Sequence, residues 1–167
     1  MAYGKIGVIG AMKEEIELFH EHMQQPTESV KAGITFYEGK FQGRPIVLCK
    51  SGVGKVNAAV TTQLLIDTFG VEAIVFTGVA GAVDPSLEVG DIVVSTECLQ
   101  HDMDVTALGF PRGTIPYEDT SLFVADEALR MLAMEAAGEL FPGRVKAGRV
   151  LSGDQFIASR ETVGQLY

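Results

Sequence analysis

The stretch VIGAMKEEIELF, residues 8–19, joins an apolar run to an amphipathic segment and so indicates the fold class. Residues 5–11 are short and apolar, and a charged segment follows them, which is typical of a buried strand. Residues 12–24 space their apolar side chains four, three and four positions apart, at Met12, Ile16, Phe19 and Met23. That spacing forms one helical face, so the stretch predicts a strand that leads directly into a helix.

The two adjacent glutamates of this stretch lie on different sides of the predicted helix. At 100° per residue, Glu14 comes about 200° from Met12, whereas Glu15 comes about 300° from it, at the border of the apolar face. Glu14 is therefore expected in solvent near the helix N-terminus, where a negative charge is favourable. Glu15 is free to point into a crevice above a sheet. Periodicity leaves two interpretations open: both are ordinary first-turn acids, or Glu15 is a catalytic group.

Strand-like and helical patterns alternate along the rest of the chain. Residues 100–120 are irregular. Strands are predicted over 33–41, 45–50, 71–77, 90–99 and 145–151, and helices over 55–69, 122–140 and 158–167. The first two of these strands flank a short turn and predict a hairpin. The alternation predicts an α/β protein with a mixed, largely parallel sheet and helices on both faces. No linker or repeat interrupts it, so residues 1–167 are predicted to form a single domain.

The net charge and the cysteine pattern disfavour several classes of partner and site. A formal net charge of -9 disfavours both a nucleic-acid backbone and an anionic membrane as partners. No segment approaches the ~20 apolar residues of a membrane span, and a cytoplasmic protein is the simplest interpretation. Cys49 and Cys98 lie in apolar runs without a CxxC pattern, which favours buried free thiols over a disulfide or a metal site.

Three glycine-rich segments follow apolar strands, at the position where open α/β sheets bind ligands. CKSGVGKVNA, residues 49–58, has valine where a Walker motif needs serine or threonine, so it predicts a tight strand-to-helix turn. TGVAGAV, residues 77–83, is either a ligand-binding turn or a plain one. LSGDQFI, residues 151–157, presents Phe156, which is either a core residue or a stacking platform for a flat base.

The segment QHDMDVT, residues 100–106, offers a further set of polar side chains. His101, Asp102 and Asp104 are too few and too irregularly spaced to predict a metal site. A solvent-facing loop or a subunit contact is the favoured interpretation.

Six motifs occur in one order and spacing between about residue 5 and about residue 160: IGAMKEEI, SGVGKVNAA, TGVAGA, VGDIVVS, HDMDVTALG and SGDQFI. Together they resemble the bacterial 5'-methylthioadenosine/S-adenosylhomocysteine nucleosidases, of the purine nucleoside phosphorylase type. The resemblance implies a three-layer α/β/α sandwich around a twisted mixed β-sheet, and a homodimer. It implies hydrolysis of the adenine N-glycosidic bond of an adenine thionucleoside, with water as nucleophile and no metal or organic cofactor. Whether the enzyme serves methionine salvage, quorum signalling or both stays open.

The resemblance also assigns roles to single residues. Glu15 matches the glutamate that activates the attacking water, and Met12 and Val53 match positions near the ribose and alkylthio groups. Phe156 matches the aromatic side chain that stacks on adenine, and Ile157 matches the residue whose backbone binds the base. The turn after the strand 71–77 is assigned to substrate binding through Val79, Ala80 and Gly81. A loop matched by Val105, Leu108 and Pro116 is expected to cover the partner subunit's alkylthio pocket.

The chain departs from the family pattern in three places. Many relatives have serine where Val79 stands, and that hydroxyl helps to position the water. Many have phenylalanine where Leu108 stands. Family members also continue past Tyr167, through a segment that binds the ribose hydroxyls and a strand ending in the aspartate that protonates adenine. We therefore expect residues 1–167 to be the N-terminal portion of a longer catalytic domain, and to be inactive alone.

Overall fold

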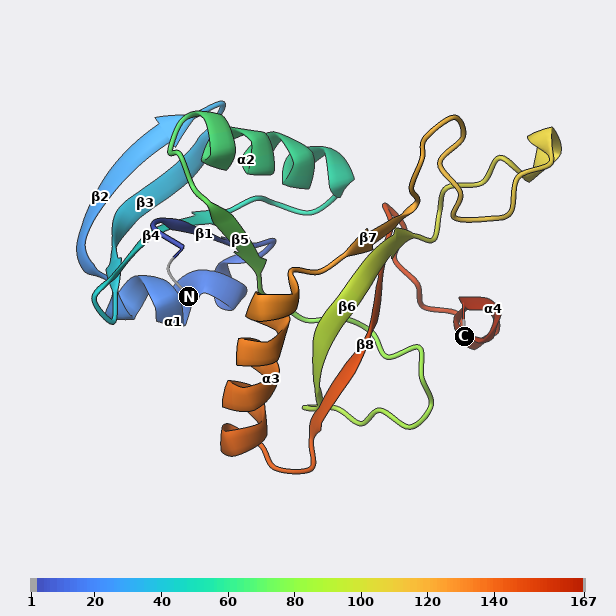
Figure 1. Ribbon diagram of the computed structural model, residues 1–167. Coiled ribbons are helices and arrows are strands. Elements are labelled where there is room, and N and C mark those ends of the chain that lie inside the picture. The colour runs from blue at the N-terminus through green and yellow to red at the C-terminus, as the bar shows by residue number, and fades with distance from the viewer. Residues whose placement is uncertain (1–2, 167) are drawn as a thin grey trace. The chain divides into compact units, whose positions relative to one another are not determined.

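The computed structural model describes residues 3–166, and the chain divides into two compact units, Met1–Ala80 and Gly81–Tyr167. Each unit is described by itself. Strands and helices alternate in both, which confirms the predicted α/β class (Figure 1). The strands lie in two sheets, one in each unit, where the sequence predicted a single one. That residues 1–167 form a single domain stays a prediction.

The first unit contains a five-stranded mixed sheet in the order β2-β3-β4-β1-β5. Its central strand β1 runs parallel to both β4 and β5, whereas β2, β3 and β4 form an antiparallel meander. The elements of the first unit are β1 Ile6–Gly10, α1 Lys13–His22, β2 Gln24–Lys31, β3 Ile34–Phe41, β4 Arg44–Lys50, α2 Lys55–Asp67 and β5 Ala73–Phe76.

Helices α1 and α2 cover opposite faces of this sheet, which gives the first unit three layers (Figure 1). Successive strand residues alternate between the faces. Val8 and Leu48 therefore pack with Ile16 of α1, in a cluster that also contains Met23 and Ile46. On the other face, the cluster beneath Leu65 of α2 contains Ile9, Phe36, Val47, Cys49 and Val71. The predicted helical face of α1 is confirmed, since Ile16 and Met23 are both buried.

The predicted hairpin is confirmed as β3 and β4. Gln42 and Gly43 connect the two strands with φ values of 47° and 79°. Two positive φ values in a two-residue loop match the right-handed twist of the flanking strands, and glycine adopts such a φ without strain.

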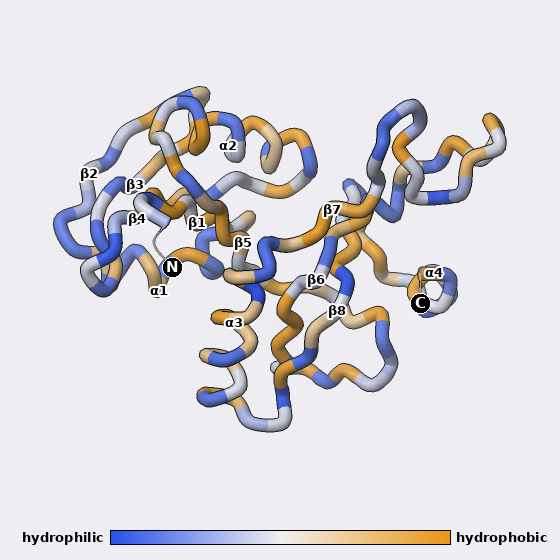
Figure 2. Tube along the Cα trace, viewed as in Figure 1, coloured by the Kyte–Doolittle hydropathy of each residue, from blue (hydrophilic) through white to orange (hydrophobic). Residues whose placement is uncertain are grey.

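Strand β2 was not predicted from the sequence. It pairs antiparallel with β3 at the edge of the sheet, and its side chains are almost all exposed. No apolar alternation marks it, and Figure 2 shows it largely in blue and white, in contrast to the orange β5. Pro26 lies where the β2–β3 register shifts, which is a position that an edge strand tolerates because no ladder hydrogen bond is lost there.

The second unit contains a three-stranded sheet in the order β7-β6-β8, with β6 parallel to β8 and antiparallel to β7. Helix α3 packs against β6 and β8. The elements of the second unit are β6 Ile92–Gln100, the 3₁₀ turn η1 Thr106–Leu108, β7 Leu122–Val124, α3 Glu127–Leu140, β8 Val145–Ser152 and α4 Arg160–Leu166. The predicted helix over 158–167 is confirmed as α4, and Tyr167 lies outside the described residues.

The prediction of one helix over 122–140 is wrong at its start. Residues 122–124 form β7, which pairs with Glu97–Leu99 of β6. The helix α3 begins only at Glu127, because the Asp126 carboxylate accepts a hydrogen bond from the Leu129 N–H over 2.8 Å and caps it. An aspartate directly before a glutamate, here Asp126 and Glu127, is typical of a helix start, and this signal was missed. Within residues 3–166, none of the helices combines the length and apolar character needed to cross a membrane.

Candidate active site

Three neighbouring parallel strands of the first unit end at one edge of the sheet. The Ser51 N–H donates to the Gly10 carbonyl over 2.9 Å, and the Thr77 N–H donates to the Ile9 carbonyl over 2.9 Å. These bonds extend the pairing of β4 and β5 with β1 to the last residues of the strands. The segments that follow the three strands therefore meet at this edge, where open α/β sheets bind ligands.

Glu15 lies at this edge and accepts three backbone hydrogen bonds. Its Oε2 accepts from the N–H of Ala11 over 2.7 Å and from the N–H of Met12 over 2.9 Å. Its Oε1 accepts from the N–H of Val79 over 3.0 Å. The side chain is half-buried, whereas Glu14 is exposed, which confirms the placement of the two glutamates predicted from helical periodicity.

Two glycines leave room for this carboxylate. A Cβ built on Gly78 would lie 2.5 Å from Oε1 and 2.9 Å from Cδ of Glu15. A Cβ on Gly10 would lie 2.9 Å from Cβ of Glu15 and 2.6 Å from a methyl carbon of Ile16. All four distances are shorter than real Cβ contacts, so a side chain at either position would displace Glu15 or the start of α1.

The glycine-rich turn between β4 and α2 is confirmed as a tight strand-to-helix connection. Gly52 and Gly54 have φ values of 82° and 102°, which residues with a Cβ atom rarely adopt. Asn57 reaches back from α2, and its Nδ2 donates to the Val53 carbonyl over 2.7 Å. The turn thereby presents the Val53 side chain outward, 75% exposed, beside the strand end.

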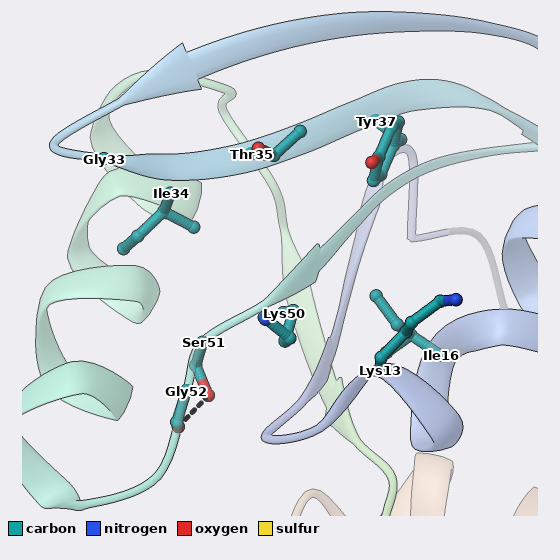
Figure 3. Close-up of a pocket in the computed structure, with 9 residues that line it drawn as sticks. All are labelled: Lys13, Ile16, Gly33, Ile34, Thr35, Tyr37, Lys50, Ser51 and Gly52. Carbon is teal, nitrogen blue, oxygen red and sulfur yellow. Dashed lines mark hydrogen bonds between the residues drawn. The ribbon is translucent and has the colours of Figure 1, made fainter.

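A cavity of about 410 Å³ opens between the start of α1, strand β3 and the end of β4 (Figure 3). It contains none of the predicted site residues; it is lined by Lys13, Ile16, Gly33, Ile34, Thr35, Tyr37, Lys50, Ser51 and Gly52. Figure 3 shows the ammonium groups of Lys13 and Lys50 pointing in opposite directions. Lys13 pairs instead with Glu17 over 3.1 Å, so the two lysines do not form a joint anion site.

The predicted base-binding residues lie in the second unit, on the loop after β8. Phe156 is 97% exposed, so the alternative that it is a core residue of its unit is wrong. Ile157 is half-buried beside it. Gly81 begins this unit in an exposed segment, and a Cβ there would meet no atom within 4 Å.

The irregular segment after β6 carries the three residues predicted to reach a partner subunit. The Asp104 carboxylate accepts from the Thr106 N–H over 3.1 Å and from the Thr106 hydroxyl over 2.7 Å, which starts the turn η1. These two bonds lower the pKa of Asp104. Val105 and Pro116 are half-buried, whereas Leu108 is 65% exposed at the end of the turn.

Both cysteines are free, Cys49 in the core and Cys98 half-buried. Burial raises the pKa of the Cys49 thiol to about 12, which keeps it neutral and unreactive. Among residues 3–166, no group of three or more His, Cys, Asp and Glu side chains is arranged to hold a metal ion.

The structure thus brings together Met12, Glu15 and Val79 through hydrogen bonds, and places Val53 and Ala80 on neighbouring segments of the same unit. Sequence reasoning missed that the partners of Glu15 are backbone N–H groups, including that of Ala11. One signal was present, because a glutamate three residues after a helix N-cap is the usual position for bonding back to the cap.

Comparisons with known proteins place the chain in a family. The family model described as the phosphorylase superfamily matches residues 5–167. The 5'-methylthioadenosine/S-adenosylhomocysteine nucleosidase of Halalkalibacterium halodurans is 44% identical over 163 residues, which are 97% of this chain and 69% of that protein. This chain spans about two thirds of the length of the curated relatives that it matches.

Solved structures give the same assignment. The nucleosidase from Neisseria meningitidis, in complex with methylthio-immucillin-A, is 40% identical with a TM-score of 0.91, over 98% of this chain and 70% of that one. The futalosine hydrolase of Helicobacter pylori is 35% identical with a TM-score of 0.91, over 98% of this chain and 70% of that one. These similarities confirm the predicted nucleoside phosphorylase-like fold. The chain belongs to the phosphorylase superfamily and, within it, to the family of bacterial 5'-methylthioadenosine/S-adenosylhomocysteine nucleosidases.

Proposed function

We propose that the complete protein hydrolyses the adenine N-glycosidic bond of 5'-methylthioadenosine and S-adenosylhomocysteine, releasing adenine and the thioribose sugar. The observation that carries this proposal is the hydrogen-bonded carboxylate of Glu15 at the edge where three parallel strands end. The names of the relatives support the substrate class.

Glu15 is proposed to hold and activate the attacking water. An ionised carboxylate offers about four acceptor positions, and three on Glu15 are occupied by backbone N–H groups. The remaining position is on Oε1, which accepts one bond where Oε2 accepts two. A water there would give its proton to Glu15 as its oxygen attacks C1' of the ribose. The C1'–N9 bond breaks, and adenine leaves with its electron pair and a proton from an acid group.

A helix cap is the competing interpretation of Glu15, since its bond to the Met12 N–H is what an N-terminal cap makes. A cap has no need of the third bond, which comes from Val79, 64 residues along the chain. That bond uses the Val79 backbone, so it does not depend on the serine hydroxyl that many relatives have at this position. We therefore propose that valine at 79 leaves the orientation of Glu15 intact.

The remaining roles follow the resemblance. Met12 and Val53 are proposed to line the ribose and alkylthio groups; both side chains are exposed near the Glu15 edge, at 38% and 75%. Phe156 is proposed to stack on adenine, and the Ile157 backbone to bind it. The 97% exposure of Phe156 supports this role, because a stacking face must be free to meet the base. Val79, Ala80 and Gly81 complete the proposed substrate contacts.

The protein is further proposed to act as a cytoplasmic homodimer in methionine salvage, quorum signalling or both, with Val105, Leu108 and Pro116 covering the partner subunit's alkylthio pocket. The exposed Leu108 supports this role. Mixing inactive Glu15→Gln protein with inactive Leu108→Asp protein tests it, because a mixed dimer regains one complete site. Recovery of about a quarter of the normal activity is expected after subunit exchange. Mixtures that stay inactive, although mass spectrometry detects mixed dimers, would contradict a shared site.

A second candidate is hydrolysis of a related purine nucleoside. The similarity to the Helicobacter pylori futalosine hydrolase, at 35% identity, favours this alternative specifically.

The experiment that tests the proposal measures release of the free purine base, adenine or hypoxanthine, by liquid chromatography from the complete protein. Methylthioadenosine, S-adenosylhomocysteine, futalosine and adenosine are compared, each with and without phosphate. Release from the two thionucleosides without phosphate is the expected result. A requirement for phosphate would instead identify a phosphorylase, and release from futalosine alone would identify the second candidate. Adenine binding without turnover of any of the four nucleosides would indicate a non-catalytic nucleoside-binding protein.

A further inference from the structure

His101 packs its imidazole ring against Gly153 in the second unit. The ring is buried, with 8% of the residue exposed. A Cβ built on Gly153 would meet Cε1 at 2.8 Å and Cδ2 at 3.0 Å, with Nε2 closer still, and these three ring atoms are its nearest neighbours. Gly153 does not have a positive φ, so its backbone would accept alanine, and the nearest atoms that oppose a side chain there belong to the His101 ring.

Two hydrogen bonds join the same two segments. The His101 N–H donates to the Ser152 carbonyl over 3.0 Å, where β8 ends. The Asp102 carboxylate accepts from the Asp154 N–H over 2.9 Å. His101 and Asp102 thus contact three successive residues of this turn: a backbone bond reaches Ser152, the ring lies against Gly153, and a carboxylate bond reaches Asp154.

This turn leads directly to Phe156 and Ile157. Phe156 is 97% exposed, so packing of its own side chain does not fix its position. The path of the loop toward Phe156 starts from the turn that His101 and Asp102 contact.

We propose that His101 is a positioning residue for base binding: its ring, seated on Gly153, sets the path of residues 153–157 that presents Phe156 and Ile157 to adenine. The proposal rests on the proposed function, which assigns adenine to this loop. His101 itself does not touch the base. Its contact is with backbone atoms of Gly153, and it acts through the loop.

The test compares four forms of the complete protein: unaltered, His101→Ala, Gly153→Ala and the double variant. Adenine affinity by calorimetry is the main readout, with kcat and KM for methylthioadenosine alongside. Gly138→Ala is the control, since Gly138 is exposed on α3 and a Cβ there would meet no atom within 4 Å. Thermal unfolding of every form separates loss of positioning from loss of folding.

Gly153→Ala is expected to raise the adenine dissociation constant on the order of ten- to a hundredfold, because the methyl group and the ring cannot share one space. His101→Ala is expected to raise it less. The double variant should have almost the same adenine dissociation constant as His101→Ala, because the added methyl group then meets no ring. Such non-additivity is the signature of two groups in contact. KM should rise more than kcat falls, since Glu15 lies in the other unit.

The proposal would be overturned if Gly153→Ala raised the adenine dissociation constant by the same factor with and without the His101 ring. Variants that lose melting temperature but keep the adenine dissociation constant would also overturn it, since the contact would then be structural only. If Gly153→Ala does not fold, recovery of a folded protein in the double variant shows the contact. The His101→Ala and double variants then carry the affinity comparison, and unchanged adenine affinity in both overturns the positioning role. Failure of the proposed function is distinct: the unaltered protein itself would not release adenine from either thionucleoside.

Discussion

The backbone N–H of Val79 donates to Oε1 of Glu15 over 3.0 Å, although 64 residues separate the two in sequence. This bond joins the segment after β5 to the first turn of α1. It orients one carboxylate oxygen, while the N–H groups of Ala11 and Met12 hold the other. The carboxylate is therefore held in place before any substrate arrives, which is what an effective general base requires.

Replacing Glu15 by glutamine should lower kcat for methylthioadenosine by ~10²–10⁴, because an amide cannot take the proton of water. Adenine release from the complete protein is the measurement. Glu14→Gln is the matched control, since Glu14 is adjacent but exposed and should leave turnover near normal. Near-normal turnover in Glu15→Gln, with the control also active, would remove Glu15 from the catalytic role.

Gly78→Ala should lower kcat at least about tenfold while changing the melting temperature little. The added methyl carbon would lie 2.5 Å from Oε1 of Glu15 and would push the carboxylate from its position, yet Gly78 itself is exposed. Gly138→Ala again serves as the control, because its methyl group meets nothing. An unchanged kcat would mean that the position of Glu15 tolerates a shift, contrary to a role that depends on orientation.

Phe156→Ala should weaken adenine binding roughly 5- to 150-fold, the range expected for loss of one base-stacking aromatic ring. Little stability should be lost, because the ring is 97% exposed. Phe156→Tyr keeps the ring and should bind adenine almost as the unaltered protein does. Calorimetric titration with adenine measures all three; equal affinity of the alanine and tyrosine variants would contradict stacking.

The buried thiol of Cys49 should make the protein less stable at alkaline pH. Burial raises its pKa from 9.0 to about 12, so between these values the unfolded chain has lost a proton that the folded chain keeps. The contribution is complete below pH 9.0 and is lost progressively as the pH rises through this window.

Comparison with Cys49→Ala isolates this effect. The difference in free energy of unfolding between the two proteins should fall by about 1.4 kcal/mol for one pH unit above the unfolded pKa. Urea unfolding at pH 8 and pH 10 measures it. A difference that does not change with pH would show that the thiol titrates equally in both states.

Prediction from sequence succeeded where a pattern was strong and local. Apolar periodicity identified α1, and the glycines of the β3–β4 and β4–α2 connections identified their turns. Strand β2 was missed because it is an exposed edge strand without apolar alternation. Its backbone pairing with β3 stabilises it, and composition does not show that pairing. Strand β7 was taken for the start of α3 because three apolar residues fit either structure, and only pairing with β6 decides between them.

The candidate site divides in the same way. Periodicity alone placed Glu15 at the edge of the apolar face and Glu14 in solvent, and both placements are confirmed. No periodicity could show that Val79 would supply a donor, since every residue carries the same backbone N–H. Nor could the sequence show that Gly153 is small because the His101 ring lies over it.

The sequence by itself determined most of the order of strands and helices, the face that α1 buries and the family to which the chain belongs. These properties follow from side-chain type and spacing, which are local. Only the tertiary structure decided which backbone groups surround Glu15 and which ring covers Gly153. Such contacts join segments far apart in the chain, and they exist only once the sheet has aligned its strand ends and packing has excluded the alternatives.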